Sequence, residues 1–313
     1  MKPSLAKPRA LRAGDTIAIV APASNIKRED LEAGCDRLQK AGYRTIFLDS
    51  ILSHDLYFAG SAERRARELE TMFAREDVQA ILCARGGYGS NYLLPLLNFE
   101  VIRKNPKIFV GYSDLTSLMT RFSRNRGFVT FHGPMAAKDW AHDNGVDMPS
   151  WNAVLSGATD TLNLQADSGI SGLCDGECEG ILSGGCLSIL VASLGTSYEM
   201  ENPNGILFLE DVAAKPFQID RMLMQLKLAG KLDHVRGIVL GEMRDCVQTA
   251  NQGYTLQEVI ARIVSPLRVP VAFGLRSGHV GERNITLPMG VNARLAVQGS
   301  DVTLTLLEPA VIA

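Results

Sequence analysis

The chain has 313 residues, of which 46% are hydrophobic and 21% are charged. This composition excludes a disordered chain, a collagen-like repeat and a disulfide-stabilised miniprotein, and the length leaves room for two domains. Lys and Arg number 32 and Asp and Glu number 34, so the net charge of -2 provides no overall basic field for nucleic acid or anionic lipid. We expect a soluble globular protein that does not have nucleic acid as its main partner.

No export signal or membrane span is expected. Arg12, Gly14 and Asp15 interrupt any apolar region near the start, and the most apolar stretches are far shorter than the roughly 20 residues that cross a bilayer. These features predict a cytoplasmic protein without a membrane partner. The six cysteines are too scattered for a disulfide framework. Cys174 and Cys178 have the spacing of half a zinc site, but no second pair follows, so we expect no metal.

Predicted strands and helices alternate in the first part of the chain. The apolar run 15–21 is typical of a strand buried on both faces, and the apolar spacing in 28–41 favours a helix that ends before Gly42. The pattern then repeats, with strands expected at 45–48, 80–83, 108–112 and 129–131 and helices at 62–75, 90–97 and 115–126. Such alternation predicts a doubly wound parallel sheet with its ligand crevice at the carboxyl ends of the strands.

The periodicity fades between residues 137 and 178, where we place a connection between two domains. We expect an N-terminal domain at 1–140, a connection at 141–178 and a C-terminal domain at 179–313. The second part is predicted to contain strands at 180–182, 206–210, 237–241 and 271–274, helices at 187–194, 217–229 and 256–264, and a hairpin of 293–297 with 302–307. Its strands need not all be parallel, so we expect a smaller mixed α/β domain.

A serine stands where one of these strands meets a helix. Ser113 follows the buried strand 108–112, and at such a turn a serine hydroxyl is exposed above the sheet. The amide of Asp114 would then point toward a developing oxyanion. Leu115 replaces the second glycine of the G-x-S-x-G motif. The alternative role for Ser113 or Asp114 is to cap the helix.

A glycine-rich segment, Arg85-Gly86-Gly87-Tyr88-Gly89, follows another strand and opens another helix. Its free backbone N–H groups suit an anion or an oxyanion, although a tight turn that needs positive φ would use the same glycines. It lacks the residues of a P-loop and the full dinucleotide fingerprint. Arg85 could neutralise a substrate carboxylate or form a surface salt bridge.

Two further segments supply an acid and a base. Glu210 and Asp211 end a buried strand, where a cap or a salt bridge is as plausible as catalysis. His279 lies in a glycine-flanked loop after the strand 271–274, and His132 is a rival base in a similar position. Together, Ser113, His279 and Glu210 would supply the nucleophile, the base and the orienting acid of a serine hydrolase.

Several separated motifs resemble the LD-carboxypeptidase family, the muramoyltetrapeptide carboxypeptidases. They are Arg85-Gly86-Gly87-Tyr88-Gly89, Gly111-Tyr112-Ser113-Asp114, Phe131-His132-Gly133-Pro134-Met135, Leu209-Glu210-Asp211, Ile219-Asp220-Arg221-Met222-Leu223, Gly278-His279 and Leu287-Pro288-Met289-Gly290. The resemblance covers nearly the whole chain.

The resemblance implies a cytoplasmic, cofactor-free serine peptidase that removes the terminal D-alanine from murein tetrapeptides by cutting an L,D bond. A flavodoxin-like N-terminal domain would carry Ser113, and a smaller C-terminal domain would carry Glu210 and His279, in a homodimer. The expected oxyanion donors are the amides of Asp114 and of Gly86 or Gly87.

The chain departs from the family pattern at Cys186, which stands where the family commonly has asparagine in Gly-Gly-Asn-Leu. Related enzymes cleave microcin-type peptidyl nucleotides and use an aromatic-bearing loop, for which Trp140 and Trp151 are candidates if they do not simply pack in the interior. Two other classes of protein are also considered. One is a non-catalytic peptide-binding module, and the other is a nicotinamide or flavin enzyme, which would need a fuller fingerprint.

Overall fold

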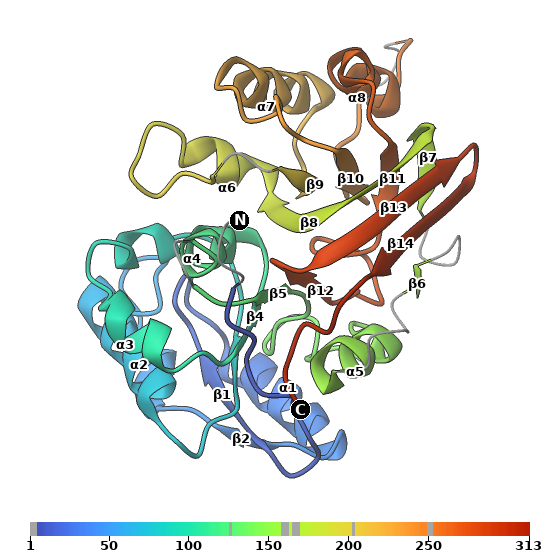
Figure 1. The fold of residues 1–313 in the computed structure, drawn as a ribbon. Coiled ribbons are helices and arrows are strands. Elements are labelled where there is room, and N and C mark those ends of the chain that lie inside the picture. Colours follow the sequence, from blue (N-terminus) through green and yellow to red (C-terminus); the bar gives the residue numbers. More distant parts are fainter. Residues whose placement is uncertain (1–4, 125–126, 158–162, 165–169, 202–203, 249–252) are drawn as a thin grey trace.

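The computed structural model describes residues 5–124, 127–157, 163–164, 170–201, 204–248 and 253–313. The strands in these ranges form two sheets, one in the lower half of Figure 1 and one in its upper right. Both sheets carry helices, so the expected α/β architecture is confirmed.

The first sheet has the strand order β12-β5-β4-β3-β1-β2. Its strands are β1 (Thr16–Val20), β2 (Arg44–Ile46), β3 (Ala80–Cys83), β4 (Ile108–Gly111), β5 (Thr130–His132) and β12 (Leu287–Met289). All neighbours from β1 to β5 pair in parallel, in the flavodoxin-like order, which confirms the predicted doubly wound sheet. The short strand β12 was not predicted, and it pairs antiparallel with β5.

The helical elements of this part are α1 (Arg28–Lys40), η1 (Asp49–Leu52), α2 (Ala62–Ala74), η2 (Ser90–Leu93), α3 (Phe99–Lys104), η3 (Ser113–Leu115) and α4 (Thr116–Phe122). The single helix predicted over 90–97 is wrong. Pro95 cannot donate a backbone hydrogen bond, and Asn98 starts α3 by accepting the N–H groups of Glu100 and Val101. The end of the helix predicted over 115–126 includes residues 125 and 126, which lie outside the described residues.

The second sheet has the strand order β6-β14-β13-β8-β9-β10-β11-β7. Its strands are β6 (Asn163–Leu164), β7 (Ser171–Cys174), β8 (Gly176–Cys186), β9 (Gly205–Glu210), β10 (Gly237–Gly241), β11 (Val271–Leu275), β13 (Asn292–Gln298) and β14 (Asp301–Leu306). The strands β8 to β11 are parallel neighbours, whereas β7, β13, β14 and β6 pair antiparallel. The expected mixed sheet is confirmed.

The remaining helices are α5 (Met148–Ser156), α6 (Leu187–Ala192), α7 (Pro216–Leu228), α8 (Leu256–Val264) and η5 (Ser265–Leu267). The first of these, α5, forms inside the predicted connection 141–178, because Asp147 caps its start by accepting the N–H of Ser150. Residues 158–162 and 165–169 of this connection lie outside the described residues. The domain boundaries at 140 and 179 stay a prediction.

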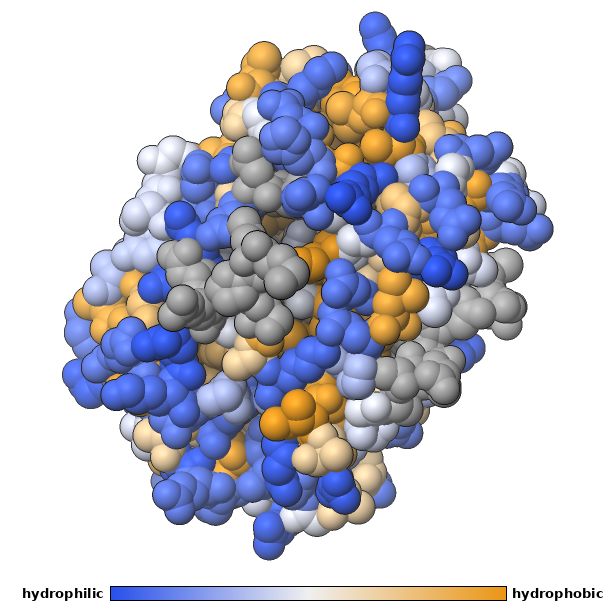
Figure 2. Space-filling model, in the orientation of Figure 1, coloured by the Kyte–Doolittle hydropathy of each residue, from blue (hydrophilic) through white to orange (hydrophobic). Residues whose placement is uncertain are grey.

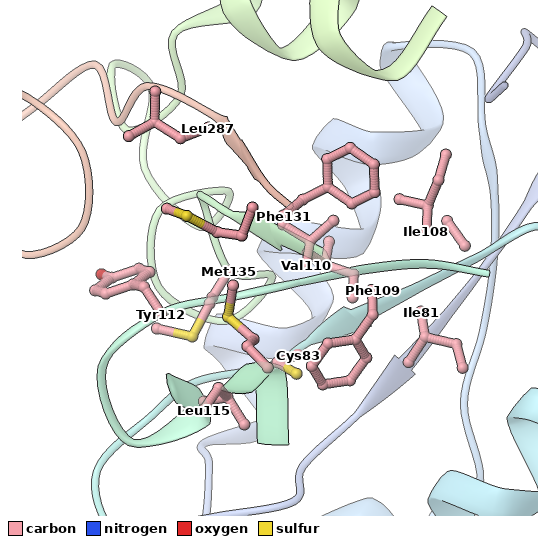
Figure 3. Packing of buried hydrophobic residues seen from close by; sticks show 14 of the residues in the cluster. Ile81, Cys83, Ile108, Phe109, Val110, Tyr112, Leu115, Phe131, Met135 and Leu287 are labelled. Carbon is pink, nitrogen blue, oxygen red and sulfur yellow. The ribbon is translucent and has the colours of Figure 1, made fainter. Parts of the chain in front are cut away.

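Two hydrophobic cores hold the sheets in place. One lies between the second sheet and the helices α6, α7 and α8, which run along the upper side of Figure 1. The other is formed by buried residues of the first sheet and its helices, and it continues to β13 and β14 at Leu295 and Leu304. Figure 3 shows part of this second core, where Ile81 of β3 and Phe109 and Val110 of β4 are buried together. Continuous apolar packing between the sheets therefore fixes their carboxyl edges relative to each other.

Hydrophilic and hydrophobic residues are interspersed on the face of the molecule in Figure 2. Among the described residues, no helix has both the length and the apolar character needed to cross a bilayer.

Candidate active site

Ser113 occupies a strained turn between β4 and α4. Its φ of 63° lies in the left-handed region, which residues with a side chain rarely adopt. A serine held in this way at the end of a parallel strand is the geometry of a nucleophile elbow. The turn leaves the Ser113 side chain partly exposed, while Tyr112 and Asp114 on either side are buried.

His279 connects this serine to an acid of the second sheet. The Nε2 atom of His279 lies 3.0 Å from Ser113 Oγ, and its Nδ1 atom lies 2.6 Å from Glu210 Oε2. Ser113 follows β4, Glu210 ends β9 and His279 follows β11. The carboxyl edges of both sheets thus bring together residues that are 166 and 69 positions apart in the chain.

The hydrogen bonds define which nitrogen of His279 carries the proton. An ionised carboxylate only accepts, so Nδ1 donates to Glu210 Oε2, which also accepts the backbone N–H of His279 at 3.1 Å. In the neutral ring, Nε2 then has a lone pair and accepts the hydroxyl hydrogen of Ser113. This is the arrangement that a general base needs before it takes the proton of a nucleophile.

Glu210 is buried, with 1% of its surface exposed. Burial raises the pKa of this carboxyl, but the neighbouring imidazoles, His279 first and then His132, outweigh burial and lower the pKa to about 2. Gly278 makes room for the group, because a Cβ built on it would lie 2.7 Å from Glu210 Cδ. The acid is therefore ionised and held in one position.

The structure does not place His132 beside Ser113, where a rival base would have to be. Its Nδ1 atom lies 2.9 Å from Ser277 Oγ, and its Nε2 atom faces Glu210 Oε1 at 3.7 Å. No hydrogen bond joins His132 to Ser113 in the part of the chain that the structure describes. His132 thus faces one carboxylate oxygen of Glu210, Oε1, while His279 binds the other, Oε2.

The glycine-rich loop lies directly beside Ser113. A Cβ built on Gly86 would lie 2.8 Å from Ser113 Cβ, so only glycine fits there without a shift. Buried Arg65 holds the loop by donating hydrogen bonds to the carbonyls of Gly89 and Pro22 at 2.7 and 2.6 Å. Sequence patterns do not single out Arg65, because an arginine inside a helix pattern usually indicates a solvent-exposed face.

The side chain of Asp114 connects the nucleophile turn to the same loop. It accepts the backbone N–H of Ser90 at 2.7 Å, and the Ser90 hydroxyl donates to the carbonyl of Asp114 at 2.6 Å. The amide of Asp114 lies in the first turn of η3, where N–H groups have no partner within the helix. Arg85 is exposed, and its guanidinium donates a hydrogen bond to the Asn25 carbonyl at 3.4 Å.

The two adjacent acids of the strand end have different surroundings. Asp211 Oδ2 accepts the backbone N–H of Ser188 at 2.8 Å and so caps α6, while Glu210 faces the histidines. Cys186 is the register partner of Glu210 on the neighbouring strand, and burial raises the pKa of its thiol well above the usual value. Its backbone N–H donates to Thr116 Oγ1 at 3.1 Å.

In the described ranges, three or more possible metal-donor atoms come together only in this cluster. Those donors are Cys186, Glu210 and His279, whose ligand atoms lie within 4.8 Å of one another. Cys174 and Cys178 do not belong to such a grouping.

Trp140 and Trp151 are packing residues. They are 3% and 1% exposed, and their rings meet edge to face at 5.1 Å, so the suggestion that they form a substrate loop is wrong. The exposed aromatic side chains near the glycine-rich loop are Tyr57, Tyr88 and Tyr92, which adjoin one another. Sequence patterns single out Tyr88 only as part of the glycine-rich segment, and they do not single out Tyr92 of η2 or Tyr57.

A serine at the edge of a doubly wound sheet, joined by hydrogen bonds through a histidine to a glutamate of a second sheet, is an arrangement typical of serine-type hydrolases. Residues 17–133 match the LD-carboxypeptidase N-terminal domain, and residues 179–295 match the LD-carboxypeptidase C-terminal domain. The chain belongs to the LD-carboxypeptidase family.

Similar proteins span nearly the same length. A probable murein peptide carboxypeptidase of Bacillus subtilis is 35% identical over 92% of this chain and 91% of its own. The microcin C7 self-immunity protein of Escherichia coli is 29% identical over 97% of this chain and 96% of its own. The crystal structure of a muramoyltetrapeptide carboxypeptidase from Oxalobacter formigenes has a TM-score of 0.83 at 28% identity and covers 94% of this chain and 99% of that one.

Proposed function

We propose that this protein is a serine L,D-carboxypeptidase that removes the terminal D-alanine from murein tetrapeptides. The observation that carries the proposal is the continuous hydrogen-bonded line from Ser113 Oγ through His279 to Glu210. Membership of a carboxypeptidase family, and relatives named for murein peptides, support this class of substrate.

In the proposed mechanism, Ser113 Oγ attacks the carbonyl carbon of the L,D bond while its proton passes to His279 Nε2. The carbonyl oxygen becomes an oxyanion, which the amides of Asp114 and of Gly86 or Gly87 stabilise. The C–N bond then breaks, and His279 returns the proton to the amine of the departing D-alanine. A water molecule that the same imidazole deprotonates hydrolyses the acyl ester and restores the hydroxyl of Ser113.

Glu210 acts through His279 in this scheme. The carboxylate holds the ring with Nδ1 protonated and stabilises the imidazolium that forms when Nε2 takes the proton. Arg85, on the loop beside the nucleophile, would neutralise a carboxylate of the substrate.

A second candidate function is the cleavage of microcin-type peptidyl nucleotides. It is favoured by the similarity to the microcin C7 self-immunity protein of Escherichia coli, which extends over almost the whole chain. Both candidates use the same three side chains, so they differ in the group that leaves, which is D-alanine in one and the nucleotide in the other. Cytoplasmic location and a homodimer remain predictions that rest on the family resemblance.

A product assay tests the proposal. The purified protein is incubated with peptides that end in an L residue followed by D-alanine, with an L-alanine-terminated control, and with a peptidyl nucleotide. We expect D-alanine release from the first group, and a loss of several orders of magnitude in Ser113→Ala with an unchanged melting temperature. Full activity of Ser113→Ala would exclude the triad, and a Ser113 that does not react with a fluorophosphonate would favour a non-catalytic binding module.

A further inference from the structure

A basic cavity of about 280 Å³ lies beside the glycine-rich loop. It lies at the carboxyl edge of the first sheet, the edge that also carries Ser113. Four of its lining side chains are basic, namely Lys27, Arg85, Lys138 and His142, and one is acidic, Asp30. Even with the histidine neutral, three positive charges face one negative charge.

The cavity is built from three loops that follow strands of the first sheet. Lys27 lies after β1, Arg85 after β3 and Lys138 after β5. These strands are parallel. β3 and β5 flank β4, whose carboxyl end carries Ser113, and β1 lies on the other side of β3. The cavity and the nucleophile therefore lie at the same edge of the sheet, which is where ligands bind in this type of fold.

Backbone hydrogen bonds join the loops at the cavity. The N–H of Ala137 donates to the carbonyl of Ala84 at 2.8 Å, and the N–H of Ser24 donates to the carbonyl of Gly86 at 3.3 Å. Gly86 in turn approaches Ser113 closely, as described above. A ligand held by Arg85 in the cavity is thus bound by the residue directly before Gly86, which approaches the nucleophile.

The cations of the cavity outnumber Asp30, the one acid in its described lining. Lys27, Arg85 and Lys138 form no salt bridge with any residue in the described ranges, and all three side chains are exposed. Nearby Arg37, in contrast, pairs with Asp143 at 2.6 Å and so removes that acid from the cavity's surroundings. Like charges that converge on a concave surface repel one another, and an anion placed between them relieves this repulsion.

We propose that this cavity binds an anionic group of the substrate that lies outside the bond being cut. The inference rests on the proposed function, since it assigns a second contact to the same substrate. A carboxylate of an acidic peptide and the phosphate of a peptidyl nucleotide offer the same chemistry to Lys27, Arg85 and Lys138. The cavity explains how one active site can accept either class.

The test compares a double variant, Lys27→Glu with Lys138→Glu, with a control of equal charge change, Lys40→Glu with Lys104→Glu. The control lysines are exposed on α1 and α3 and do not line the cavity. Substrates are an acidic peptide ending in D-alanine, the same peptide with its side-chain carboxylates amidated, and a peptidyl nucleotide with and without its phosphate. We expect about tenfold or higher KM for the charged substrates in the cavity variant, with kcat nearly unchanged.

The uncharged analogues should bind the wild type and the cavity variant equally. A KM increase confined to the acidic peptide identifies a carboxylate as the anion, and one confined to the nucleotide identifies the phosphate. Equal KM values in the cavity variant and the control, for every charged substrate, would overturn the inference.

Equilibrium binding separates this inference from the proposed function. Each ligand is titrated into Ser113→Ala and into Ser113→Ala carrying the two cavity substitutions, so that no turnover is needed. Weaker binding of the charged ligands by about tenfold supports the cavity even if the wild type releases no D-alanine. Unchanged dissociation constants for all four ligands would contradict it even if the enzyme is active.

Discussion

Glu210 Oε1 and His132 Nε2 face each other across 3.7 Å in the interior, and neither atom has a hydrogen-bond partner among the described residues. The hydrogen bonds of Ser277 show that Nδ1 of His132 carries a proton. Its hydroxyl donates to the carbonyl of Ile285 at 2.8 Å, so its oxygen accepts from His132 Nδ1. A proton on Nε2 makes the contact with Glu210 an ion pair, whereas its absence leaves a lone pair facing the carboxylate. We therefore expect His132 to be a second imidazole that positions the acid.

His132→Ala should lower kcat about tenfold, equivalent to about 1.4 kcal/mol in the barrier, with little change in KM. The reason is that Glu210 loses the group that holds Oε1 in place, while the substrate loses no contact. His132→Gln, whose amide can donate to the same oxygen, should recover part of the loss.

The control for His132 is His234→Ala, at a histidine that is exposed and not part of this buried cluster. Melting temperatures of all variants separate a folding defect from a positioning defect. A kcat for His132→Ala equal to that of the wild type would show that Glu210 does not depend on His132.

Gly86→Ala should lower kcat about 100-fold while the protein remains folded. The added Cβ would lie 2.8 Å from Ser113 Cβ and 3.0 Å from its Oγ, so the hydroxyl must move away from His279. Displacements of about 1 Å at reacting groups can cost this much. Gly253→Ala, at a glycine with open space around it, is the matched control in the same assay. Equal activity of both variants would mean that the loop can yield without moving the serine.

The stability of the protein should fall as the pH decreases from about 5 to 3.5, in part because of Glu210. The folded-state pKa of Glu210 is about 2, below the usual 4.5, so its stabilising contribution is present above pH 4.5 and is lost as the pH falls toward 2. Between pH 5 and 3.5 this single group accounts for about 1 kcal/mol of the free energy of unfolding.

Urea unfolding of the wild type and Glu210→Gln at both pH values measures this contribution. The variant lacks the titrating group, so its loss of stability over the interval should be smaller by about 1 kcal/mol. Parallel losses in the two proteins would indicate that the carboxyl titrates normally in the folded state.

Much of this protein follows from local sequence patterns. The buried strands β1, β3, β4, β9 and β10 were predicted near their observed ends, because continuous apolar runs bounded by turn residues have few alternatives in a parallel sheet. The same reasoning placed Ser113, Glu210 and His279 at strand ends. Chemistry at the carboxyl edge of a parallel sheet is a consequence of topology, which the order of strands and helices already indicates.

The tertiary structure decided how those strand ends meet. Periodicity cannot show that the edges of two sheets face each other, nor that His132 faces Glu210 rather than Ser113, since both depend on packing between distant segments. It also cannot detect β12, whose three residues are a strand only because β5 offers a free edge. The basic cavity also depends on tertiary structure. Lys27, Arg85 and Lys138 belong to three loops, and only the folding of the parallel sheet brings their charges to one place.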